Sequence, residues 1–153
     1  MVEKVISGGQ TGVDRAALDA ALELGIPCGG WCPQGRRAED GIIPGRYPMQ
    51  ETSSSAYPMR TEMNIEDSDG TVILTRGSPV GGTLLTLKLA RKHRKPYILA
   101  DPAQEEDVAS VREWCRGNQI RILNVAGPRE SEAPGIYYQA FSFLKDLFIN
   151  ISV

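Results

Sequence analysis

The 153-residue chain has the composition of one globular domain, with 41% hydrophobic residues, 24% charged residues and a formal net charge of −2. A general nucleic-acid-binding protein would usually carry a basic excess, so this balance argues against that class. No apolar run is long enough to span a bilayer, and the N-terminus leads into a strand-like stretch with no signal peptide before it. We therefore expect a cytoplasmic protein with a single domain over residues 1–153.

The first part of the chain predicts a strand, a helix and a second strand. Residues 2–6 form a short buried strand that ends at Ser7-Gly8-Gly9. A helical period follows Gly12, with Gly25 where a C-cap is expected. Its apolar face consists of Val13, Ala17, Ala20 and Leu24. Residues 27–31 predict the second strand.

Residues 33–58 show no sustained period and are rich in Gly, Pro, Arg and Ser. A segment of this length without regular structure is usually a binding loop or a disordered one. Residues 60–67 then predict a short helix.

The second half alternates strands and helices. Strands are expected at residues 71–74, 97–100 and 120–125; helices are expected from residue 79 to near 95, from 105 to 116, and from Pro134 onward. This alternation predicts an α/β fold with a mainly parallel sheet covered by helices on both faces.

Three strands are followed by glycine-bearing polar turns that lead into helices. These turns are residues 8–12, 76–83 and 127–131. In open parallel sheets, ligands bind beyond the carboxyl ends of the strands, so we expect the turns to converge on one site.

The turns favour an anionic ligand, because a helix N-terminus offers unpaired N–H groups and glycines allow close backbone approach. Arginine adds charge and bidentate contact with phosphate. The predicted ligand-binding residues are Gly8, Gly9, Gln10, Thr11, Gly12, Arg15, Arg36, Arg60, Gly81, Gly82, Thr83, Gly127 and Arg129. For any one turn a purely structural role is equally acceptable, and Thr11 with Asp14 also matches a capping box.

Several common sites are not indicated. The turn at residues 8–12 does not match G-x-G-x-x-G, no P-loop motif occurs, and one histidine gives little material for a Ser-His-Asp triad. Cys28, Cys32 and Cys115 give no disulfide framework. A structural zinc site needs four ligands, so no structural metal is predicted.

Six runs carry a family resemblance. They are residues 7–18, 29–33, 35–41, 60–64, 67–71 and 124–131, spread over nearly the whole chain. Together they resemble the molybdenum carrier family. The resemblance implies a Rossmann-like three-layer sandwich and a homo-oligomer such as a tetramer. It also implies a cytoplasmic protein that holds the molybdenum cofactor (molybdopterin) as cargo, with molybdenum-dependent enzymes as partners.

A more distant resemblance concerns catalysis. The turn at residues 79–86 looks like that of the lysine decarboxylase-like, cytokinin-activating phosphoribohydrolases, in which a glutamate is catalytic. Here Thr86 stands where that glutamate would fall, so no residue has an obvious acid/base role. We therefore predict a non-catalytic binding protein.

The expected binding mode places a phosphate against residues 8–12 or 81–83, with Arg15, Arg60 or Arg129 offsetting further charge. The segment 33–58 would cover the pterin. The alternatives are a nucleotide-binding sensor and an enzyme acting on a nucleoside phosphate, with candidate acids Asp14, Glu39, Asp40, Asp67 and Asp69.

Overall fold

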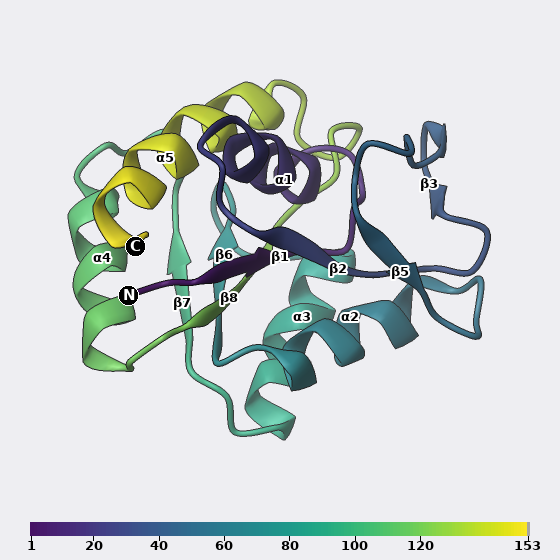
Figure 1. Ribbon diagram of the computed structural model, residues 1–153, viewed down its shortest axis with the longest axis horizontal. Helices are drawn as coiled ribbons and strands as arrows, with labels where there is room; N and C mark the ends of the chain where they lie inside the picture. The colour runs from purple at the N-terminus through teal and green to yellow at the C-terminus, as the bar shows by residue number, and fades with distance from the viewer. Residues whose placement is uncertain (153) are drawn as a thin grey trace.

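The centre of the molecule is a six-stranded sheet in which all strand pairs are parallel (Figure 1). In this computed structural model, which describes residues 1–152, the strand order is β5-β2-β1-β8-β6-β7. The strands are β1 (Lys4–Ile6), β2 (Cys28–Cys32), β5 (Met49–Glu51), β6 (Gly70–Leu74), β7 (Tyr97–Ala100) and β8 (Ile122–Ala126). The predicted α/β class is confirmed.

Helices cover both faces of the sheet, which gives three layers (Figure 1). Helices α1 (Val13–Glu23), α4 (Asp107–Gly117) and α5 (Ile136–Ile151) lie on one face; α2 (Tyr57–Asp67) and α3 (Gly81–Lys92) lie on the other. Helix α5 packs against both α1 and α4. Its buried stripe, which includes Phe143 and Leu147, fills the main core, as its apolar period predicts.

The two ends of the described chain meet on this side of the molecule. The amide of Val2 donates to the carbonyl of Ile151 at 2.8 Å, and Val2 forms an isolated parallel bridge with Ser152. The end of α5 is thereby fastened to the start of the sheet.

The expectation that residues 33–58 lack regular structure is wrong. Strands β3 (Arg37–Ala38) and β4 (Gly41–Ile42) form a small antiparallel hairpin, and β5 extends the main sheet beside β2. A second apolar cluster anchors the segment to α1 and β2; its buried members are Leu18, Cys32, Ala38, Ile43 and Tyr47. These elements have two or three residues each, too short for a period to be visible in the sequence.

Four helices begin two or three residues away from their predicted starts; α3 begins at Gly81 rather than at residue 79, and α4 at Asp107 rather than at residue 105. Helix α2 begins at Tyr57, with Pro58 in its first turn, rather than at Arg60. Helix α5 begins at Ile136 rather than at Pro134, because the Glu130 carboxylate accepts hydrogen bonds from the amides of Gly135 and Tyr137 at 2.5 and 3.0 Å. Within residues 1–152, no helix is long and apolar enough to cross a membrane.

Candidate ligand-binding site

A cavity of about 330 Å³ lies beyond the carboxyl ends of the central strands. Strand β8 lies between β1 and β6, and the chain leaves these two neighbours toward opposite faces, into α1 and α3 (Figure 1). Such a switch point leaves a crevice in which ligands bind. The cavity is lined by Gln10, Asp14, Tyr57, Pro58, Arg60, Thr61, Gly81, Gly82, Thr83, Leu85, Thr86, Ala126, Gly127, Arg129 and Glu132.

Seven of the predicted residues line this cavity; the three turns therefore converge, but they contribute unequally. The seven are Gln10, Arg60, Gly81, Gly82, Thr83, Gly127 and Arg129. Gly8 lies beside it, in a small recess shared with Arg60, and a Cβ at Gly8 would collide with the Arg60 guanidinium. Thus most of the wall comes from the first part of α3, the end of β8 with the segment after it, and the start of α2.

The turn after β1 is instead packed against the rest of the protein. Gly12 has φ +79°, and a Cβ there would overlap the carbonyl oxygen of Pro128. Gly9 has φ +75°, and its Cβ position faces Ile43 at 2.9 Å rather than the cavity. Thr11 accepts a hydrogen bond from the Glu130 amide at 3.1 Å and bonds Glu39 through its hydroxyl. These residues join the turn to its neighbours.

Arg15 and Arg36 also lie outside the cavity lining. The Arg15 guanidinium donates to the Gly9 carbonyl and pairs with Asp40 at 2.8 Å. The Arg36 guanidinium donates to the carbonyls of Ile43, Pro44 and Tyr47. Both side chains therefore hold segment 33–58 in place.

The N-terminus of α3 presents free donors to the cavity. The amides of Thr83 and Leu84 donate to the Val80 carbonyl, whereas those of Gly81 and Gly82 meet no acceptor within residues 1–152. Gly81 and Gly82 are both exposed, and among residues 1–152 nothing lies within 4 Å of a Cβ at Gly82, so this end of the helix is accessible. With the positive end of the helix dipole, the two amides form a suitable anion-binding position.

Two arginines bring positive charge to the same cavity. The Arg60 side chain, only 14% exposed, donates from Nη1 to Thr61 Oγ1 at 2.5 Å, and its buried Nε has no acceptor among residues 1–152. Arg129 is more exposed, and its Nε lies 2.8 Å from Glu132 Oε1. Buried donors without acceptors are costly, so Arg60 is ready to receive an anionic or carbonyl oxygen.

Asp14 is not among the ligand-binding residues predicted from the sequence. It nevertheless lines the cavity and is only 5% exposed. Burial raises its carboxyl pKa to about 6, despite the opposing effect of Arg60. In the sequence, an acidic residue in the first turn of α1 is explained equally well by stabilisation of the helix, so a place in the ligand site is not indicated.

The other four candidate acids do not line the cavity. Asp40 pairs with Arg15, whose guanidinium lowers the pKa of that carboxyl; Asp67 accepts from the Trp31 indole at 2.7 Å. Asp69 accepts from the amides of Arg121 and Ile122, and Glu39 accepts from Ser131 at 2.5 Å. Each has a structural partner.

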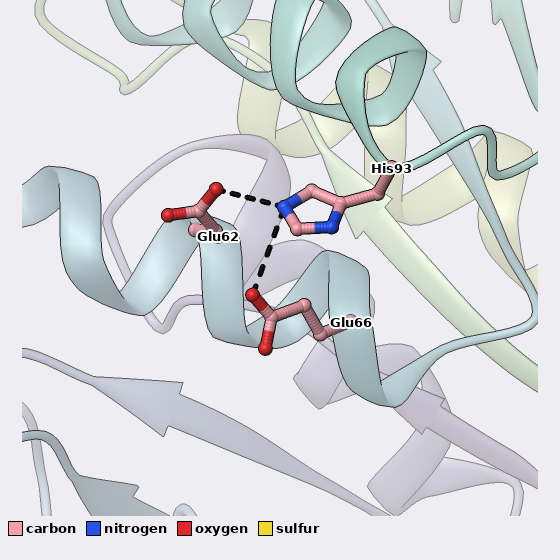
Figure 2. A group of neighbouring side chains, drawn as sticks. All are labelled: Glu62, Glu66 and His93. Atoms are coloured by element: carbon pink, nitrogen blue, oxygen red, sulfur yellow. Dashed lines mark hydrogen bonds and ion pairs between the residues drawn. The ribbon is translucent and has the colours of Figure 1, made fainter.

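One group within residues 1–152 brings three potential metal ligands together (Figure 2). Glu62 and Glu66 on α2 face His93 at the other end of α3, with His93 Nε2 lying 2.7 Å from Glu62 Oε2 and 3.6 Å from Glu66 Oε1. Lys92 Nζ already lies 3.0 Å from the same Glu62 oxygen. The group fastens α2 to the C-terminal end of α3.

Comparison with known proteins then identifies the family. A model of the circularly permutated YpsA SLOG family matches residues 5–148. The chain belongs to this family. All three turns and the whole cavity lie inside the SLOG-family match.

A solved structure extends the comparison. The present chain is 43% identical to a solved structure, a "Putative molybdenum carrier protein" from Syntrophus aciditrophicus SB. The alignment covers 97% of this chain and 95% of that chain, with a TM-score of 0.92. A search of curated protein sequences gives no match. The similarity agrees with the resemblance found in the sequence.

Proposed function

We propose that the protein is a carrier that binds the molybdenum cofactor in the cavity between α2, α3 and the end of β8. The observation that carries the proposal is the meeting of the open α3 N-terminus with Arg60 and Arg129 in one cavity of about 330 Å³. That volume is within the range of small-molecule sites. The similar protein from Syntrophus aciditrophicus, named as a molybdenum carrier, supports this choice of cargo.

The phosphate of the cofactor is placed at the amides of Gly81 and Gly82, with Arg129 beside it. Gly9 and Gly12 are unsuitable for this role because their Cβ positions face Ile43 and the 128–130 backbone. The flat pterin lies deeper, between the Tyr57 ring and Leu85, which supply apolar and aromatic surface.

A carrier role is preferred over catalysis because the cavity lacks a placed acid/base pair. Thr86, at the position of the expected glutamate, uses its hydroxyl to donate to the Gly82 carbonyl at 3.0 Å. The carboxylates lining the cavity are Asp14 and Glu132, and Glu132 is paired with Arg129. The catalytic glutamate of the phosphoribohydrolase-like turn is therefore absent from α3, where Thr86 stands in its place.

Self-association and delivery of the cofactor in the cytoplasm to molybdenum-dependent enzymes complete the proposal. Large apolar side chains on the α5 surface, Tyr138 at 75% and Ile149 at 61% exposure, offer contact area for a second copy. Analytical ultracentrifugation would show an oligomer, and a monomer at all concentrations would remove this part of the proposal.

The binding test is an anaerobic titration of the purified protein with molybdenum cofactor, in the presence of adenosine monophosphate as a competitor. We expect tight binding that the nucleotide does not displace. Binding of the nucleotide without binding of the cofactor would overturn the carrier proposal and favour a nucleotide sensor or enzyme.

A further inference from the structure

A buried carboxylate in the wall of an anion-binding cavity requires a reason. Asp14 lines both the large cavity and the small recess beside Gly8, and it is 5% exposed. A negative charge at this place repels the phosphate that the α3 amides and arginines would attract. An acid that only stabilised the α1 dipole could equally lie on the solvent side of the first turn.

The protein itself satisfies this carboxylate only in part. Asp14 Oδ2 accepts a long hydrogen bond of 3.3 Å from the Gln10 amide, and Arg60 Nη2 lies 4.0 Å away, beyond hydrogen-bond distance. The backbone near Gly8 also favours the charged form. A carboxylate can accept about four hydrogen bonds, so acceptor capacity remains unused.

The geometry points to a selective role: we propose that Asp14 binds ligands carrying two adjacent N–H donors, as the ring N–H and exocyclic amino group of a pterin do. This inference rests on the proposed function, because it assumes a phosphate-bearing ligand in the same cavity. A carboxylate accepts two parallel N–H bonds in a bidentate arrangement. Guanine carries the same donor edge as a pterin, whereas adenine does not.

The other charged groups near Asp14 influence the pH at which its carboxyl group ionises. Arg60 faces it from α2, Arg15 lies one residue along on α1, and Arg129 and Glu132 line the same cavity after β8. No histidine is among the lining residues. Protonation of Asp14 therefore removes one negative charge from the cavity. It also removes a carboxylate acceptor for the N–H donors of the ligand.

The first test needs no variant. Guanosine monophosphate should compete with the cofactor about 10- to 100-fold better than adenosine monophosphate, since hydrogen bonds to a charged group distinguish them. Sulfate, which keeps its charge in this range, should bind more tightly as the pH falls through about 6, while the cofactor binds less tightly. Equal competition by the two nucleotides, or parallel pH profiles for sulfate and cofactor, would overturn the role of Asp14.

The second test uses Asp14→Asn, with the exposed Glu113→Gln on α4 as a control of equal charge change. We expect Asp14→Asn to lose about 10- to 100-fold in cofactor affinity and to gain sulfate affinity, and Glu113→Gln to change neither. Unchanged cofactor affinity in Asp14→Asn would overturn this inference alone. A wild-type protein that binds neither cofactor nor guanosine monophosphate would overturn the proposed function as well.

Discussion

The glycine-rich turns after β1 and β6 have similar compositions but different surroundings. At Gly12 the neighbouring backbone leaves no room for a Cβ, whereas at Gly82 nothing lies within 4 Å of that position. The first turn uses glycine for packing, and the second keeps helix amides open to a ligand. A run of glycines after a strand therefore predicts a close backbone approach, but not whether the approaching group is protein or ligand.

Among variants of the two turns, Gly12→Ala is expected to have the largest effect on stability. The new Cβ would overlap Pro128 O, and φ +79° is unfavourable for an L side chain, so the free energy of unfolding should fall by about 2–4 kcal/mol. Urea denaturation measures this change, with Gly82→Ala as the matched variant. Similar stabilities for the two variants would remove the distinction between the turns.

Arg60→Met should weaken ligand binding in the cavity while leaving the packed turn after β1 folded. Removal of the buried guanidinium is expected to lower cofactor affinity about 10- to 100-fold, because charge-assisted bonds to the ligand are lost. Calorimetric titration provides the measurement, and Arg116→Met on the exposed face of α4 is the control. Equal affinity in both variants would place the ligand elsewhere.

Asp14→Asn should show how much the buried carboxylate in the cavity wall lowers the stability of the fold. Burial raises the folded pKa of Asp14 above its ordinary value of 3.8 to about 6, so folding takes up a proton between these values and wild-type stability falls as the pH rises through that window. Above pH 6 the Asn variant should be more stable by about 1–3 kcal/mol, and the two should converge near pH 4. Denaturant melts at pH 4 and pH 7.5 check this; a constant difference between the two pH values would contradict it.

The smallest effect is expected from His93→Gln, which removes the contacts of the imidazole with Glu62 and Glu66 at the far end of α3. Partly exposed polar contacts contribute little, so the thermal midpoint should move by less than about 3 °C. Cofactor affinity should stay unchanged, since this group lies outside the cavity lining. A large loss of affinity would show that the α2–α3 junction controls the site.

The sequence predicts the fold class because helical segments with apolar faces alternate with short apolar strands along the chain. It also predicts where the cavity lies, since parallel strands bring the turns that follow them to one edge. It does not predict the roles of Arg15 and Arg36, because nothing in an arginine's local sequence shows whether carbonyls of a distant segment will accept its donors. Asp14 is obscured in the same way, since a first-turn acid has an ordinary role in any helix.

If the cargo binds at the open α3 N-terminus, a bulky side chain at Gly82 should block it, and a matched pair of valine variants measures this effect. Gly82→Val fills the approach to the free amides, and Gly117→Val makes the same change at an open position at the end of α4. In an anaerobic titration with molybdenum cofactor, the Gly82 variant should lose at least about tenfold in affinity while the Gly117 variant matches the wild type. Equal affinity in all three proteins would show that the cargo does not bind at the α3 N-terminus.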